Sequence, residues 1–386
     1  MFLKFRHDDN GYYVKRNVWL YIIACFAISR FLMVAVHIAI TNTISIQSFI
    51  ADMQQYDAGW YIGYVDAIAQ RKFNVYPPLG YANWNFFPLY PLCVYIAHSI
   101  SGVSVPLMAM SLNSLFFLIS EYYTYKYIML TRHNMKIAKV FIFVMSFGPY
   151  SFYCSSSYSE GLFLMLLSLC FYYMKKKDYI KMGIAGGFLS ATRSVGIMFV
   201  FVILIECITE MLQTKGENWR TVLGKRLSNA NLIFGTTLIP AGFFAYSAFL
   251  AVKLGDGLAF VHSQEVPWER SVHVGLIHNM IDALINNFPP TYFGVICLVG
   301  IILIIYLVLD KHYEEAIFPI IVCVVSMDTF LTAAPRYLFG SLMVILSLSE
   351  RVCRWTKPSR IMFLGFILIF ELVLVREWFL GNWMLM

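Results

Sequence analysis

An aspartate lies between aromatic residues near the start of the chain, in the run Gln54-Gln55-Tyr56-Asp57-Ala58-Gly59-Trp60-Tyr61. Apolar neighbours limit the solvation of a carboxylate, which suits Asp57 to accept a proton, and the face of Trp60 can stack on a sugar ring. The pattern is equally typical of an interfacial helix cap, because Asp is a preferred N-cap residue and Trp and Tyr favour the edge of a bilayer. Asp57 is therefore a candidate general base, with the helix cap as the alternative.

Two arginines stand in apolar or aromatic surroundings, Arg193 within Thr192-Arg193-Ser194 and Arg336 before Tyr337. The forked donors of a guanidinium match the oxygens of a phosphate. An arginine at membrane depth is costly, which makes it a functional candidate by default. We expect both residues to bind a lipid phosphate or diphosphate, and the alternative is an ion pair with Glu160 or Asp57.

Two further polar clusters suit carbohydrate. In Ser155-Ser156-Ser157-Tyr158-Ser159-Glu160, Tyr158 and Glu160 can orient a polyol, although hydroxyl residues followed by an acid also form ordinary helix caps. In the later run from His262 to Arg270, Gln264 and Trp268 are the preferred sugar-binding pair, although a solvated loop would look similar. These four residues complete the set of predicted substrate contacts.

The composition decides which class of protein holds these residues. Hydrophobic residues make up 59% of the 386 positions and charged residues 13%, whereas a soluble domain carries roughly a quarter charged residues. The mean hydropathy is +0.67. So few charges cannot build a water-soluble surface, so lipid must cover much of the protein. The net charge of +7 is no sign of nucleic acid, because no basic face is interleaved with exposed aromatics.

Cysteine and histidine spacing indicates no metal or disulfide site. The eight cysteines have no CxxC spacing and lie mostly in apolar runs, and the eight histidines form no HExxH. The sequence therefore identifies no cofactor. The outer Asp and Glu residues are too few and dispersed to argue for a metal site, and a role for a divalent metal stays open. Nucleotide-binding glycine motifs are absent as well, so no site for a soluble nucleotide donor is evident.

Basic residues predict the topology, because they hold loops on the cytoplasmic side. Lys15 and Arg16 precede a first apolar span over about residues 17–40, too late for a cleavable signal, and the polar segment 41–85 then lies outside with short interfacial helices. Another outer loop covers about residues 254–290. The predicted cytoplasmic turns are Arg132/Lys136/Lys139, Lys175 to Lys177 with Lys181, Lys215/Arg220/Lys225/Arg226, Lys311 with His312, and Arg351/Arg354/Lys357/Arg360.

The prediction is thus an all-α polytopic protein with about 10–12 membrane helices in one domain over residues 1–386. From Lys181 to Arg193 there are too few residues for a full span, about 18 Å of helix, so a pair of short helices should meet near Arg193. A second such pair should meet near Arg336. Segment 86–101 is short and begins with prolines, and we expect it to be re-entrant or interfacial. Broken helices are tolerated at membrane depth only where they line a protein cavity or water.

Several of these motifs occur in a familiar order. Tyr56-Asp57-Ala58-Gly59-Trp60-Tyr61 is followed by Phe86-Phe87-Pro88-Leu89-Tyr90-Pro91, Tyr158-Ser159-Glu160, Ala191-Thr192-Arg193 and Arg336-Tyr337. The set, spanning about residues 50–340, resembles the PIG-V family of mannosyltransferases and its bacterial relatives in the GT-C superfamily. The resemblance implies a GT-C fold, a polyprenyl- or dolichyl-phosphate-linked sugar donor, usually of mannose, and inversion at the anomeric carbon.

The resemblance also assigns residues. The family's first-loop acid corresponds to Asp57, and its Tyr-Ser-Glu and Thr-Arg elements correspond to Tyr158-Ser159-Glu160 and Thr192-Arg193. The tryptophan that usually precedes the acid is Tyr56 here, which leaves the acceptor open among glycans, lipids and proteins. The predicted reaction has Asp57 taking the proton of an acceptor hydroxyl while Arg193 and Arg336 stabilise the leaving lipid phosphate.

Two other functions stay open at this point. A transporter or flippase of a lipid-linked sugar would also need intramembrane arginines, but such proteins more often show related halves, and no internal repeat is visible. A non-catalytic subunit of a membrane complex would need no acid at an acceptor site. We expect a multi-pass protein of a bacterial plasma membrane, or of the ER membrane if eukaryotic, with its active site on the non-cytoplasmic side.

Overall fold

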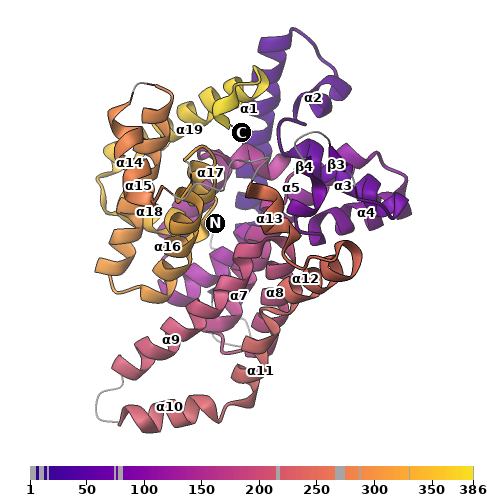
Figure 1. Cartoon of the computed structure of the whole chain (residues 1–386). Coiled ribbons are helices and arrows are strands. Elements are labelled where there is room, and N and C mark those ends of the chain that lie inside the picture. Colours follow the sequence, from indigo (N-terminus) through magenta and orange to yellow (C-terminus); the bar gives the residue numbers. More distant parts are fainter. Residues whose placement is uncertain are drawn as a thin grey trace.

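Helices make up most of the residues that the computed structural model describes, which are residues 6–7, 13–14, 17–73, 75–76, 81–213, 218–265, 274–286, 288–329 and 331–385 (Figure 1). In this part of the chain the only strands are two short antiparallel pairs, β1 (Arg6–His7) with β2 (Tyr13–Val14) and β3 (Val75–Tyr76) with β4 (Tyr81–Ala82). The predicted all-α class is confirmed. Lys15 and Arg16, used for the orientation of the first span, lie outside the described residues.

Six helical segments among the described residues are long and apolar enough to cross a membrane. They are Val18–Thr41 (α1), Val105–Thr131 (α5), Ser194–Leu212 (within η3, Ser194–Met198, and α9, Phe199–Gln213), Ala230–Leu254 (α11, Ala230–Leu238, and α12, Ala241–Leu254), Pro290–Leu309 (α15) and Lys357–Phe379 (α19). The chain is therefore an integral membrane protein.

The expected count of 10–12 membrane helices includes shorter ones. The shorter helices are α2 (Ile46–Asp52), α3 (Ala58–Gln70), α4 (Leu89–Ser101), α6 (Met135–Phe147), α7 (Glu160–Lys175), α8 (Tyr179–Thr192), α10 (Trp219–Leu227), α13 (Ala259–Glu265), α14 (Leu276–Ile285), α16 (Tyr313–Met327), α17 (Ala334–Phe339) and α18 (Leu342–Arg354). Helix α7 is almost entirely buried and packs between α5 and α8. Protein rather than lipid surrounds it, so its short length leaves no backbone group exposed to hydrocarbon.

The pair of short helices predicted at Arg193 is only half right. Helix α8 has 14 residues, but the helix that follows Arg193 belongs to a 19-residue apolar segment, long enough to span. At Arg336 both neighbouring helices are short, since α16 has 15 residues and α18 has 13. Helix α4 has 13 residues, or about 20 Å of helix against a hydrocarbon core of about 30 Å, which agrees with a segment that does not cross.

The predicted cytoplasmic turns meet one another through ion pairs. Arg132 at the end of α5 contacts Glu315 of α16 at 2.5 Å and Glu350 of α18 at 2.6 Å. Lys175 at the end of α7 contacts Glu314 at 2.7 Å. Two further sets of ion pairs lie there. Arg226 contacts Glu206 and Glu210, and Arg351 contacts Asp310. We call this side of the helix bundle the basic end.

Glycines bring α8 against the α11–α12 span. A Cβ atom at Gly183 would lie 2.2 Å from the carbonyl oxygen of Gly235, and one at Gly242 would lie 2.1 Å from that of Gly187. Small residues permit such close backbone approach between membrane helices. This close packing holds the end of α8 in position, and with it Arg193, the residue that follows the helix.

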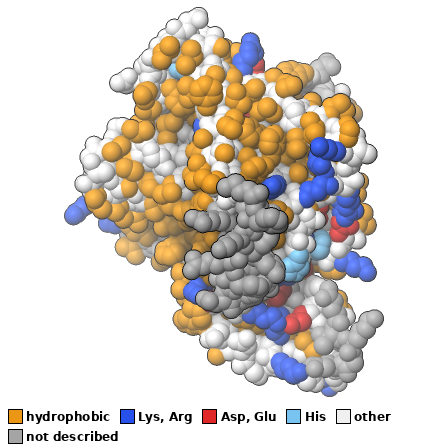
Figure 2. All heavy atoms as spheres, turned by 180° about the vertical axis from the view of Figure 1, so that it is seen from behind, with side chains coloured by type: hydrophobic (Ala, Val, Ile, Leu, Met, Phe, Trp, Pro, Cys, Tyr) orange, Lys and Arg blue, Asp and Glu red, His pale blue; other side chains and the backbone are white. Residues whose placement is uncertain are grey.

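The outer surface of the bundle is apolar. Figure 2 shows hydrophobic side chains across most of one face, with charged side chains toward its edges. Leu20 is 66% exposed and Phe31 71% exposed on α1, and Phe366 is 60% exposed on α19. Such exposure would be costly in water and is the expected boundary with acyl chains.

Candidate active site

Four charged side chains converge on one cavity of about 350 Å³. Asp57 and Glu160 supply carboxylates, Arg193 and Arg336 supply guanidiniums, and Gln264 of α13 lies in the same wall. Asp57 and Arg336 are 279 positions apart in the sequence. The fold therefore gathers residues that the sequence offers only as separate motifs.

Each of the four residues sits where the chain turns between helices. Asp57 directly precedes α3, Glu160 is the first residue of α7, and Arg193 follows α8 in an extended conformation with φ of −152°. Arg336 lies in the six-residue α17. Helix ends offer free backbone groups and room for polar side chains, so the charges lie away from lipid.

The charges form two ion pairs. Arg336 Nη2 lies 3.0 Å from Asp57 Oδ2, and Arg193 Nη2 lies 2.6 Å from Glu160 Oε1. Arg336 Nε is also 3.7 Å from Glu160 Oε1. The ion pairs that the sequence offered as an alternative to phosphate binding are thus present, and they link all four residues into one chain of charges.

Arg336 retains an unused donor. Its Nη1 is buried and has no hydrogen-bond partner in the part of the chain that the structure describes. Its guanidinium carbon lies 5.0 Å from the ring centroid of Tyr337, 5.1 Å from that of Tyr153 and 5.3 Å from that of Tyr158. A buried polar group without a partner costs about 1–3 kcal/mol, so a ligand that offers an acceptor atom to Nη1 would remove this cost.

Both arginines stay charged. Burial opposes the charged form of Arg336, but Tyr337, Asp57 and Glu160 together hold its pKa well above the ordinary value. Burial likewise opposes the charge of Arg193, and Glu160 raises its pKa above the ordinary value. The cavity therefore presents permanent positive charge in surroundings where solvent screens it weakly.

Tyr158 holds the segment before Asp57 in place. Its hydroxyl accepts a hydrogen bond from the backbone N–H of Asp57 at 3.0 Å and donates one to the carbonyl of Gln55 at 3.1 Å. Between them, Tyr56 has a φ of +51°, which a bulky residue rarely adopts. Tyr158 was predicted to orient a polyol, but its hydroxyl is engaged with the backbone that carries the acid.

Ser159 holds the side chain of Arg193 in place. The Ser159 hydroxyl accepts a hydrogen bond from Arg193 Nε at 3.0 Å and lies 2.7 Å from the hydroxyl of Tyr61. Burial raises the pKa of Tyr61 to about 12, so its hydroxyl stays protonated. Sequence reasoning did not single out Ser159, because a serine in a run of serines resembles a helix cap.

A buried clamp fixes the segment that leads into Glu160. Arg30 of α1 donates from Nη1 to the Ser151 hydroxyl and from Nη2 to the Ser151 carbonyl, both at 3.0 Å. Glu371 of α19 lies 2.8 Å from the Ser151 hydroxyl and accepts from Phe152 N–H at 3.2 Å. Sequence reasoning missed this clamp, although charged residues inside the apolar spans 18–41 and 357–379 were its signal.

The other predicted contacts are placed as follows. Trp60 stacks on Phe86, with ring centroids 6.1 Å apart and planes at 16°, and only Phe86 of the two lines the cavity. Trp268 lies outside the described residues. No group of three His, Cys, Asp or Glu side chains able to hold a metal occurs within the described ranges.

One wall of the cavity is apolar. Phe163, Leu164 and Leu167 line it from α7, and Phe318, Val322 and Val325 line it from α16. The α7 set extends about 6 Å along its helix and the α16 set about 10 Å. Val325 is 56% exposed, so the wall reaches the lipid-facing surface. The cavity can therefore accommodate a polar head beside the charges and an apolar chain along α7 and α16.

Comparison with known proteins identifies the fold. No family model and no curated protein sequence matches the chain. Among solved structures, ArnT from Cupriavidus metallidurans bound to undecaprenyl phosphate has a TM-score of 0.54 at 13% identity, over 88% of this chain and 61% of that one. The oligosaccharyltransferase from Archaeoglobus fulgidus in its apo form has a TM-score of 0.53 at 11% identity, over 96% of this chain and 56% of that one.

A third structure, AglB from Archaeoglobus fulgidus with an inhibitory peptide and a dolichol-phosphate, has a TM-score of 0.53 at 11% identity, over 94% of this chain and 56% of that one. The chain thus spans about three-fifths of the length of the proteins it resembles. The similarity confirms the expected GT-C-like polytopic helical fold.

Proposed function

We propose that the protein is a membrane glycosyltransferase that moves a sugar from a polyprenyl-phosphate donor to an acceptor hydroxyl. The observation that carries the proposal is the convergence of Asp57, Arg193 and Arg336 on one cavity whose apolar wall opens to lipid. The fold shared with ArnT and AglB, which were solved with undecaprenyl phosphate and dolichol-phosphate, supports such a donor. The resemblance of the motifs to the PIG-V family favours mannose as the sugar.

Asp57 is the proposed general base. Its side chain is 21% exposed, compared with 7% for Glu160, so it is the carboxylate that an entering acceptor can reach more easily. Arg336 holds Oδ2, and this contact orients the carboxylate with Oδ1 available. Asp57 takes the proton of the acceptor hydroxyl as that oxygen forms a bond to the anomeric carbon.

The arginines are the proposed anchor for the leaving group. As the new bond forms, the bond from the anomeric carbon to the phosphate oxygen breaks, and the phosphate leaves with the electron pair. Arg193 and the free Nη1 of Arg336 can stabilise the charge that develops on that oxygen, and the buried aromatic surroundings of Arg336 strengthen the effect. The prenyl chain lies along Phe163, Leu167 and Val322 throughout.

The positions of the two ends of α7 support an active site on the non-cytoplasmic face. Glu160 begins α7 at the cavity, and Lys175 ends α7 at the basic end, about 22 Å away. Loops rich in Lys and Arg stay in the cytoplasm. The basic end is then cytoplasmic, and the cavity opens near the opposite surface.

The test is a transfer assay with the purified protein in liposomes and a radiolabelled polyprenyl-phosphate mannose. The wild type should move label to an acceptor fraction, and Asp57→Asn should lose this transfer at an unchanged melting temperature. Asp256→Asn, which removes an exposed acid paired with His262, is the matched control and should stay active. Full activity of Asp57→Asn would exclude it as the base, and label that crosses the bilayer without transfer would indicate a flippase.

A further inference from the structure

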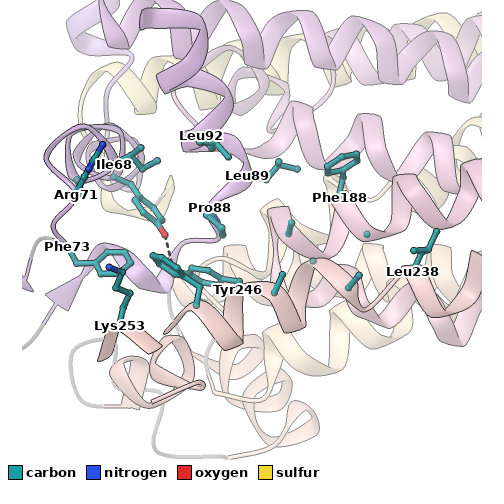
Figure 3. A pocket seen from close by; sticks show the side chains of 18 of the residues that line it. Ile68, Arg71, Phe73, Pro88, Leu89, Leu92, Phe188, Leu238, Tyr246 and Lys253 are labelled. Carbon is teal, nitrogen blue, oxygen red and sulfur yellow. Dashed lines mark hydrogen bonds between the residues drawn. The ribbon is translucent and has the colours of Figure 1, made fainter. Parts of the chain in front are cut away.

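A second and larger hollow, of about 880 Å³, lies between α3, α4, α8 and α12 (Figure 3). We call it the lateral groove. It shares no lining residue with the candidate active site, although Pro88 and Ala191 of the groove directly adjoin Phe87 and Thr192 of that cavity. Its lining is mainly apolar, from side chains such as Leu92, Phe188 and Leu238, and small residues of α8 and α12 form part of its wall. The proposed reaction gives this groove no role.

Cations lie at one end of the lateral groove. Arg71 and Lys72 follow α3, and Lys253 lies in the last turn of α12. All three side chains are exposed, and none of these side chains has an ion-pair or hydrogen-bond partner among the residues the structure describes. Figure 3 shows Arg71 and Lys253 at one end of the groove and Phe188 and Leu238 toward the other. This distribution is complementary to an amphiphile with an anionic head and an apolar tail.

The dimensions suit a membrane lipid. Leu238 and Lys253 belong to one apolar span, and their separation of 15 positions corresponds to a rise of about 22 Å. One leaflet of a bilayer core is about 15 Å deep. The groove is therefore long enough for an acyl chain of the same leaflet. Ile184 is 49% exposed and Phe249 44% exposed, so the groove is open sideways to lipid.

The position of the cations argues against a substrate. Asp57 and Arg71 lie at opposite ends of α3, and their 14-residue separation corresponds to about 21 Å. A phosphate held by Arg71 and Lys253 therefore keeps its own headgroup hydroxyls far from Asp57. The occupant that fits is a lipid that the reaction does not consume.

We propose that the lateral groove binds an anionic glycerophospholipid of the bilayer. Its phosphate contacts Arg71, Lys72 and Lys253, and one acyl chain lies along α8 and α12 past Phe188. The lipid packs against α3, which begins directly after Asp57, and against α8, which ends directly before Arg193. If the proposed function holds, the bound lipid braces both active-site elements, and sugar transfer becomes dependent on anionic lipid.

Binding is tested without any use of activity. The purified full-length chain in neutral detergent is titrated with phosphatidylglycerol or phosphatidylcholine, and bound lipid is counted by native mass spectrometry. Phosphatidylglycerol should bind more tightly. Each basic residue contributes about fivefold to the affinity, so the pair Arg71→Gln with Lys253→Gln should lose about 30-fold. The matched pair Lys357→Gln with Arg360→Gln, at the basic end, should change nothing.

A second variant tests the tail. Ile184→Trp places a bulky ring at an exposed position of the groove wall and should weaken phosphatidylglycerol without removing its advantage over phosphatidylcholine. Equal binding of the two lipids, or full affinity in the Arg71/Lys253 pair, would overturn the proposal. Radiolabel on phosphatidylglycerol itself after the transfer assay would also overturn it, because the groove would then hold a substrate. Absence of transfer in every bilayer would defeat the proposed function and leave the binding result intact.

Discussion

Replacing Arg336 by lysine keeps the positive charge of the cavity but removes the guanidinium. The arginine donates from Nη2 to Asp57 at 3.0 Å and to the Tyr337 hydroxyl at 3.1 Å, and it presents a free Nη1. It also lies within about 5 Å of three tyrosine rings. A lysine offers a compact ammonium that cannot reproduce this fork.

The expected loss follows from the contacts. A hydrogen bond to a charged group contributes about 1.5–3 kcal/mol. Arg336→Lys removes one such bond to Asp57 and, in the proposed transition state, one to the leaving phosphate. The minimum loss is then about 3 kcal/mol, which corresponds to a rate of transfer about 150-fold lower.

The assay is single-turnover transfer from radiolabelled donor, read beside a melting curve. Arg132→Lys is the matched control, because Arg132 pairs with Glu315 and Glu350 and none of these three residues lines the cavity. Arg132→Lys should lower the melting temperature and leave the rate per folded molecule unchanged. The reasoning is refuted if Arg336→Lys transfers sugar within threefold of wild type while losing as much thermal stability as the control.

Two further outcomes are expected. Tyr158→Phe removes both hydrogen bonds that hold the Asp57 segment, about 1 kcal/mol each, so transfer should fall about 30-fold with the KM for the donor unchanged; a raised KM alone would assign Tyr158 to donor binding. Arg30→Met leaves Glu371 buried beside Ser151 without its cationic neighbour, so the free energy of unfolding should fall by about 3–5 kcal/mol. Adding Glu371→Leu should recover much of that loss in thermal melts, and no recovery would show that the two residues act independently.

Much of the membrane architecture follows from the chain itself. Composition excludes a soluble protein, because 13% charged residues cannot cover a surface in water. The basic loops also predict which helix ends lie together, and the ion pairs between Arg132, Glu315 and Glu350 join three of those ends. Composition and the positions of basic loops depend only on which residues the chain contains and where they occur in it, so they can be read without knowledge of packing.

Candidate residues for the site can also be named in advance. Asp57, Arg193 and Arg336 stand out because charge within apolar sequence is costly and needs a reason. The sequence also offers Glu160 and Asp57 as ion-pair partners of the arginines, but it does not say which arginine each carboxylate contacts. Glu160 pairs closely with Arg193 rather than with Arg336, and Tyr158 turns its hydroxyl to the backbone instead of the cavity. These choices depend on distances of a few ångströms between helices far apart in the chain.

The clamp and the lateral groove likewise depend on how helices far apart in the chain pack together. Arg30 of α1 and Glu371 of α19 meet through Ser151, and Gly187 and Gly242, which line the groove, let α8 and α12 touch. The sequence establishes the cost of each buried charge and the freedom of each glycine. Which neighbours offset that cost or use that freedom is settled by helix packing, since side-chain contacts are short-ranged and require a particular three-dimensional arrangement.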